Sequence, residues 1–180
     1  MEYNKRIASV NEYFRYYFDS AYSAINMATR DKKILTQDFI ERIMLAVTEV
    51  NGCKVCSQAH VKMALESGMT DEEISELLSN EKDKVPEDQS VAVMFATHYA
   101  DKNGKPDKEI TDILYDKYGK KLGKSIIAVC RIIMVGNVFG IAMDTIKTSN
   151  KLRELAIILG SVILVPVYLI VFILGLIFNR

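Results

Sequence analysis

The feature that most constrains the fold of this chain is an uncharged segment near its C-terminus. Residues 155–178 form a run of 24 residues without a charged side chain, whereas charges are scattered throughout residues 1–154. Because an α-helix rises about 1.5 Å per residue, a helix of this length would measure about 36 Å and could cross a hydrocarbon core of about 30 Å with some tilt. The sequence therefore predicts a single transmembrane helix over about 155–178.

Pro166 lies near the middle of this segment and predicts a bend in the helix. Proline lacks a backbone N–H group, but membrane helices tolerate it because neighbouring groups satisfy the freed carbonyl. The alternative is a helix buried in the core of an oligomer, although a domain of this size could hardly surround a helix that is apolar on every side. We therefore divide the chain into a folded domain, residues 1–150, and a C-terminal membrane anchor, residues 151–180.

Basic residues beside the apolar segment predict its orientation. Lys147, Lys151 and Arg153 precede the segment, and only Arg180 follows it. By the positive-inside rule, this asymmetry places the N-terminal domain in the cytoplasm. The three cysteines agree with a cytoplasmic, reducing location, since their spacing does not suit the long-loop disulfide framework of a small secreted protein. No apolar run follows the first basic residues, so no cleavable signal peptide is expected.

The charge balance bears on possible partners. Lysine plus arginine equals aspartate plus glutamate at 23 each, so the whole chain offers no attraction to a phosphate backbone, and no nucleic acid partner is expected. The one notable charge run comprises lysines 117, 120, 121 and 124. We interpret it as a solvated turn, or alternatively as a contact with anionic lipid headgroups.

The domain before the apolar segment is predicted to be all-α. Apolar positions recur at spacings of three and four residues, and alternation typical of strands is scarce. Caps, glycines and prolines place the expected helices at about 7–25, 36–50, 53–68 and 70–78, from Pro86, from about 110 to Gly119, and at 122–146.

The second constraining feature is the motif Cys53-Lys-Val-Cys56-Ser-Gln-Ala-His60. On a helix, both cysteines and the histidine fall within an arc of about 60°, a face shared with Met63 and Ala64, which predicts a sheltered, partly apolar pocket. A cysteine in the first turn of a helix is stabilised as a thiolate by free backbone amides and the helix dipole. His60 can accept and return the thiol proton. The motif predicts a redox centre in which one cysteine resolves the oxidised form of the other.

Glu41 and Glu49, on the preceding predicted helix, are the candidates to orient His60. Glu41 falls among apolar positions on the helical wheel, whereas Glu49 shares a face with Arg42 and is expected to form a solvated ion pair with it. The wheel therefore favours Glu41 as the buried partner of the histidine.

Two other interpretations of the cysteine pair stay open, namely half of a zinc site and an inert thiol pair. Structural zinc normally needs a second pair of ligands, and the rest of the chain offers only Cys130 and His98, each isolated in a helical context. Cys130 is expected to be a small core residue, and His98 a solvated or hydrogen-bonded helix residue.

The spacing of Glu41, Cys53, Cys56 and His60 resembles that of the alkylhydroperoxidase D and carboxymuconolactone decarboxylase superfamily. The resemblance is most specific over residues 36–80. It implies an AhpD-like helical bundle that assembles as trimers or hexamers and reduces hydroperoxides through a disulfide-forming pair. The decarboxylase branch fits less well, because its members do without this cysteine pair.

The resemblance also implies roles for individual residues. Cys56 would be the peroxidatic thiol, Cys53 the resolving thiol, and Glu41 with His60 the proton relay. No bound cofactor is expected, because an external dithiol such as lipoamide or a thioredoxin-like protein would reduce the pair again. Val55 departs from the pattern, since peroxidase members can carry histidine immediately before the second cysteine.

These expectations combine into a membrane-anchored thiol oxidoreductase that faces the cytoplasm and acts on hydroperoxides, including lipid-derived ones. One alternative is a general dithiol–disulfide exchange protein, which the valine at position 55 favours. Another is a non-enzymatic membrane interaction module whose cysteines sense redox state.

Overall fold

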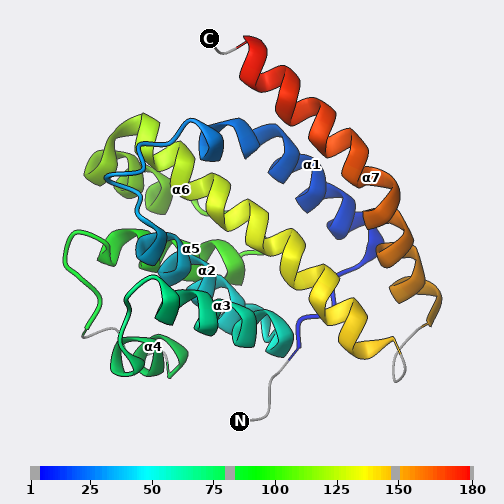
Figure 1. Ribbon diagram of the computed structural model, residues 1–180, viewed down its shortest axis with the longest axis horizontal. Helices are drawn as coiled ribbons and strands as arrows, with labels where there is room; N and C mark the ends of the chain where they lie inside the picture. The colour runs from blue at the N-terminus through cyan, green and yellow to red at the C-terminus, as the bar shows by residue number, and fades with distance from the viewer. Residues whose placement is uncertain (1–4, 80–83, 147–150, 179–180) are drawn as a thin grey trace.

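The computed structural model describes residues 5–79, 84–146 and 151–178, which form seven helices and no strand (Figure 1). The predicted all-α fold is confirmed. In chain order, the helices are α1 (Val10–Ala28), α2 (Gln37–Asn51), α3 (Lys54–Glu66), α4 (Asp71–Leu78), α5 (Ser90–Asp101), α6 (Lys108–Thr145) and α7 (Lys151–Phe178).

Helix α6 forms the centre of the bundle. It packs against α1, α2, α3, α5 and α7, while α2 forms a second centre that also contacts α3, α4 and α5. Figure 1 shows α6 crossing the molecule, with α1 and α7 on one side and α2 to α5 on the other. The core between them is filled by large side chains such as Phe95 and Tyr99, whose burial supplies much of the hydrophobic stabilisation.

Two capping boxes fix where α1 and α4 begin. In each, the cap hydroxyl accepts from the third helical amide and the glutamate at that position accepts from the cap amide: Ser9 with Glu12, and Thr70 with Glu73. The backbone hydrogen bond from Thr70 lowers the pKa of Glu73, and the nearby guanidinium of Arg42 lowers it further. The helix start expected at about residue 70 is confirmed, whereas the sequence prediction started α1 too early, before Ser9.

Two other expected boundaries differ in detail from the structure. Pro86 does not start α5, which begins at Ser90, because Pro86 instead accepts the backbone N–H of Gln89 at 2.8 Å in a preceding turn. The break expected at Gly119 is present inside α6, where this residue has φ 69° and ψ 164°. Glycine tolerates this left-handed φ without the steric cost that a Cβ atom would add.

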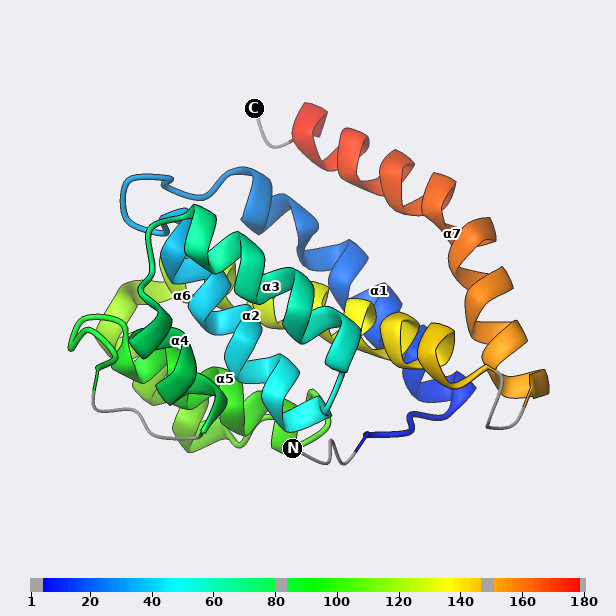
Figure 2. The same cartoon turned by 60° about the horizontal axis from the view of Figure 1, so that its bottom comes forward.

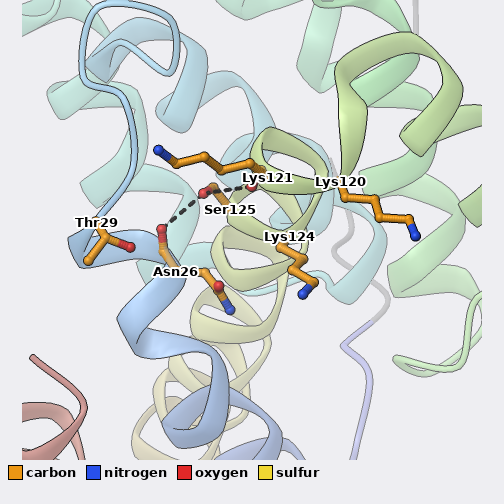
Figure 3. Close-up of a pocket in the computed structure, with 6 residues that line it drawn as sticks. All are labelled: Asn26, Thr29, Lys120, Lys121, Lys124 and Ser125. Carbon is orange, nitrogen blue, oxygen red and sulfur yellow. Dashed lines mark hydrogen bonds between the residues drawn. The ribbon is translucent and has the colours of Figure 1, made fainter. Parts of the chain in front are cut away.

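The lysine run spans this break, and its last three lysines lie beside the C-terminal end of α1. Ser125 joins the two helices by donating to the backbone oxygen of Asn26 at 2.9 Å. Figure 3 shows the side chains of Lys120, Lys121 and Lys124 pointing away from one another around a polar pocket, so their charges do not converge on one point. The proposed contact with lipid headgroups stays a prediction.

The start of α7 belongs to the folded core. Ile157 is fully buried, and so is Glu154, whose carboxylate accepts from the Thr145 hydroxyl at 3.0 Å. Arg153 donates to the backbone oxygen of Ala8 at 2.6 Å. The predicted domain boundary at residue 150 lies outside the described residues, and the packing shows that the helix beyond it is not a detached tail at its base.

Two described helices, α6 and residues Lys151–Leu174 of α7, are long and apolar enough to cross a membrane. The apolar stretch of α6 is mostly buried within the bundle, as in the core helix of a soluble protein, whereas almost none of that of α7 is buried. Figure 2 shows α7 running along the outside of the bundle and bending on its way, which the proline inside this helix explains. A membrane span over α7 stays a prediction. Its orientation does too, since Lys147 and Arg180 lie outside the described residues.

Candidate redox site

The cysteine pair lies at the sharp turn between α2 and α3. Helix α2 ends at Gly52, which adopts a left-handed conformation with φ 67° and ψ 32° that suits glycine. Cys53 is then the N-cap of α3, and its Sγ accepts the backbone N–H of Cys56 at 3.3 Å. The two cysteines form a disulfide across a Cα–Cα distance of 5.3 Å.

The two sulfur-bearing residues differ in their access to solvent. Cys53 is only 1% exposed, whereas Cys56 is partly exposed at the surface of α3. The neighbouring Val55 is also exposed. A reactant arriving from solution would therefore meet Cys56 first, with Cys53 behind it.

The contact expected between Glu41 and His60 is present. The Glu41 Oε2 atom lies 2.7 Å from Nδ1 of His60, and the carboxylate is fully buried. Its other oxygen, Oε1, accepts from the side-chain amide of Gln37. A carboxylate at Nδ1 holds the neutral imidazole in the tautomer with the proton on Nδ1. Nε2 is then the ring nitrogen that could exchange a proton with a cysteine.

The predicted ion pair between Glu49 and Arg42 is wrong. Arg42 is 3% exposed and donates instead to Gln89 at 2.9 Å and to Glu73 at 3.2 Å. The reason is tertiary packing, because α4 and α5 cover the side of α2 on which the arginine lies. Partial burial raises the pKa of Glu49.

The face of α3 that carries the motif is less sheltered than the wheel predicts. Ser57 and Ala64 are buried where α3 packs against α2 and α6, whereas Met63 is 40% exposed. Exposure on this face therefore rises from Cys53, which is buried, through Cys56 and His60, which are partly exposed, to Met63. The site is thus partly exposed to solvent, which leaves Cys56 accessible.

Two glycines of α6 complete the site and were missed by the sequence reasoning. The carbonyl oxygen of Gly136 lies 3.7 Å from the Sγ atom of Cys56. One turn later, a Cβ atom added to Gly140 would lie 2.6 Å from Sγ of Cys56 and 2.8 Å from Sγ of Cys53. Glycine in a helix interior costs about 1 kcal/mol of stability relative to alanine. Two glycines one turn apart in an apolar helix therefore indicate in the sequence that another segment packs closely against that helix.

Replacing Gly140 with alanine is expected to destabilise the oxidised protein by about 1–3 kcal/mol, because the added methyl group overlaps both sulfur atoms. Chemical denaturation of the full chain, oxidised and reduced, measures the change in the free energy of unfolding. Gly136→Ala is the matched control, since the nearest atom to its new Cβ is Cδ1 of Ile133 at 3.8 Å. Equal stability of wild type and Gly140→Ala in the oxidised state would contradict this close packing.

The other two candidate ligands have partners or surroundings of their own. Cys130 is fully buried in α6, and burial raises the pKa of its thiol. The Nε2 atom of His98 accepts the backbone N–H of Asp107 at 3.1 Å. Across the residues that the structure describes, no group of three or more histidine, cysteine, aspartate or glutamate side chains is arranged to hold a metal ion.

Comparison with known proteins identifies a family for part of the chain. Residues 17–82 match the family model described as the carboxymuconolactone decarboxylase family. The match extends from α1 to just beyond α4 and includes all four predicted site residues, whereas α5, α6 and α7 lie outside it. Searches of curated proteins and of solved structures found no match.

Proposed function

We propose that this chain, whose residues 17–82 match the model of the carboxymuconolactone decarboxylase family, is a thiol oxidoreductase that reduces organic hydroperoxides. The observation that carries the proposal is the arrangement of the disulfide. Cys56 is accessible, Cys53 lies buried behind it, and a buried carboxylate holds His60 one helical turn further along α3. This arrangement supplies a nucleophile, a resolving thiol and a proton relay.

The first half of the reaction takes place at Cys56. Its thiolate attacks the terminal oxygen of the hydroperoxide, the O–O bond breaks, and the alkoxide leaves as an alcohol after taking a proton through His60. Cys56 becomes a sulfenic acid. Cys53 then attacks this sulfur, the S–O bond breaks, and water leaves. The dithiol has given two electrons to the peroxide, and the cysteines end as a disulfide.

Three features of the fold support this chemistry. The thiols lie at the N-terminal end of α3, where free amides and the helix dipole favour a thiolate. Glu41 at Nδ1 would stabilise the imidazolium form of His60 when Nε2 takes up a proton. The short separation of the two cysteines lets the second thiol reach the first without unfolding the helix.

A dithiol from outside the protein would complete the cycle, so we propose no bound cofactor. One thiolate of the reductant attacks the accessible Cys56 and forms a mixed disulfide, which releases Cys53 as a thiolate. The second thiol of the reductant then releases Cys56. Lipoamide and a thioredoxin-like protein are both reductants of this class.

The proposal includes a membrane location and self-association. The outer side of α7 exposes a continuous set of aliphatic residues, among them Leu159, Ile163 and Ile170, which supports anchoring in a bilayer. The basic residues before the apolar segment favour a cytoplasmic position of the bundle. A homotrimer or hexamer is the assembly that the family resemblance implies.

General dithiol–disulfide exchange is the second candidate function, and one residue favours it. Val55, immediately before Cys56, is 49% exposed and cannot carry a proton. Without a histidine at this position, proton transfer to a leaving alkoxide depends on His60 alone, whereas exchange between thiols makes a smaller demand on a general acid.

We expect the full chain in detergent to consume tert-butyl hydroperoxide with dihydrolipoamide as reductant, in a one-to-one ratio and well above the rate without protein. The measurement is peroxide loss together with lipoamide formation. Cys130→Ser is the control and should match wild type, because Cys130 is enclosed in the core. Reduction of a disulfide substrate without peroxide consumption would replace this proposal with the exchange function, and inactivity on both would leave a redox sensor.

A further inference from the structure

An apolar pocket of about 450 Å³ lies between α1, α6 and α7. Tyr13 and Tyr17 line it from α1, Phe139 from α6, and Val165 and Leu169 from α7. Its volume falls within the range of about 300–1,000 Å³ that is typical of small-molecule sites. Since α7 forms one of its walls, the pocket lies on the side of the bundle along which α7 runs in Figure 1.

The pocket adjoins the disulfide through the backbone of α6. Gly136 lines the pocket, and its carbonyl oxygen lies 3.7 Å from the Sγ atom of Cys56. Gly140, one turn later, packs directly against both sulfur atoms. Gly136 therefore borders the pocket and also lies near the sulfur that the proposed reaction uses.

The chemistry of the walls indicates a hydrocarbon occupant. The hydroxyl groups of Tyr13 and Ser161 bond to each other at 2.6 Å, and the hydroxyl of Tyr17 donates to the backbone oxygen of Leu164. The described residues that line the pocket include no charged side chain. A charged ligand would lose hydrating water without finding an opposite charge on these residues, whereas an alkyl chain would gain from the burial of its apolar surface.

The position of the pocket indicates where such a chain would come from. One wall is α7, which is the predicted membrane span, and the other side of this helix is covered with exposed aliphatic side chains. The helix that forms this wall therefore has one apolar side toward the pocket and another toward its surroundings, where lipid chains could lie against it. A membrane lipid is thus the nearest source of an apolar chain.

We propose that this pocket binds the hydrocarbon chain of a lipid-derived hydroperoxide and presents its peroxide group to Cys56 past Gly136. The inference rests on the proposed peroxidase function and names its substrate class. The reaction is the one given above: the O–O bond of the lipid hydroperoxide breaks, Cys56 takes the terminal oxygen, and the lipid leaves as an alcohol. The external dithiol supplies the two electrons.

The test fills the pocket from α7 and compares a long and a short substrate. Val165→Trp places a large ring in the pocket, and Val167→Trp is the matched control, because it lies about 200° further around the helix and does not line the pocket. For Val165→Trp, the ratio of kcat/KM for linoleic acid hydroperoxide to that for tert-butyl hydroperoxide should fall about tenfold or more. The control should keep the wild-type ratio, and an unchanged ratio in Val165→Trp would overturn the inference.

A binding measurement separates this inference from the peroxidase proposal itself. The probe is cis-parinaric acid, a fluorescent unoxidised chain, titrated into the full protein in detergent at a fixed detergent concentration. Saturable binding by wild type and by Val167→Trp, weakened by Val165→Trp, supports the pocket even if no peroxide is consumed. Binding that is the same in all three proteins would overturn the chain site while leaving the peroxidase proposal to its own assay.

Discussion

Replacing Cys56 with serine is expected to lower kcat/KM for hydroperoxide reduction by at least about 10³-fold, because the hydroxyl cannot replace the thiolate as the nucleophile. Cys56 is the partly exposed member of the pair, so its loss removes the atom that the peroxide reaches first. The measurement is peroxide consumption by the full chain with a dithiol reductant. A mass spectrum of the protein after peroxide treatment should also lack the Cys53–Cys56 disulfide.

Cys53→Ser separates the two thiol roles. This variant should still be oxidised once at Cys56 and then stop, so a sulfenic acid should accumulate and react with dimedone. Cys130→Ser is the control for a third thiol, since Cys130 is fully buried and burial raises its pKa. If Cys56→Ser formed the sulfenic acid and Cys53→Ser did not, the assignment of attacking and resolving thiols would be reversed.

The parts of the structure that follow from local sequence could be predicted from the chain alone. Helical periodicity gave the all-α class, Thr70 gave the start of α4, and Gly119 gave the break inside α6. The partner of His60 was also within reach, because Glu41 lies among apolar positions of α2 and its burial follows from that pattern. The first three features depend on residues within one or two turns of each other, and the fourth joins two consecutive helices.

The features that could not be predicted depend on packing between distant segments. Arg42 and Glu49 share a helical face, but α4 and α5 provide other partners for the arginine. In the same way, the close approach of Gly140 to the disulfide joins residues more than 80 positions apart. A helical wheel describes one helix at a time, so it cannot show which neighbour covers which face.

The site therefore combines residues inside and outside the segment that matches the family model. The segment that matches the family carries both cysteines, His60 and Glu41 on α2 and α3. Helices α6 and α7, outside that segment, provide the glycine surface under the disulfide and the apolar pocket beside it. On the proposed function, the first part would carry the redox chemistry and the second would select the substrate.

Replacing Glu41 with glutamine is expected to lower kcat by about 10²- to 10⁴-fold while leaving KM almost unchanged. The amide keeps the shape of the side chain, but it has no charge to stabilise an imidazolium, and its N–H₂ group can hold the wrong tautomer of His60. Glu41 is fully buried and lies 2.7 Å from Nδ1 of His60, so water cannot readily replace the lost carboxylate. Steady-state kinetics with tert-butyl hydroperoxide and dihydrolipoamide measure both parameters.

Glu49→Gln provides the matched control, because it removes a carboxylate from the same helix. Burial raises the pKa of Glu49 because it disfavours the charged form, so a neutral amide should be tolerated at this position. This variant should keep the wild-type kcat, whereas Glu41→Gln should lose it although the disulfide still forms slowly with excess peroxide. Equal losses in the two variants would mean that α2 contributes only stability, and the relay through His60 would then have to be abandoned.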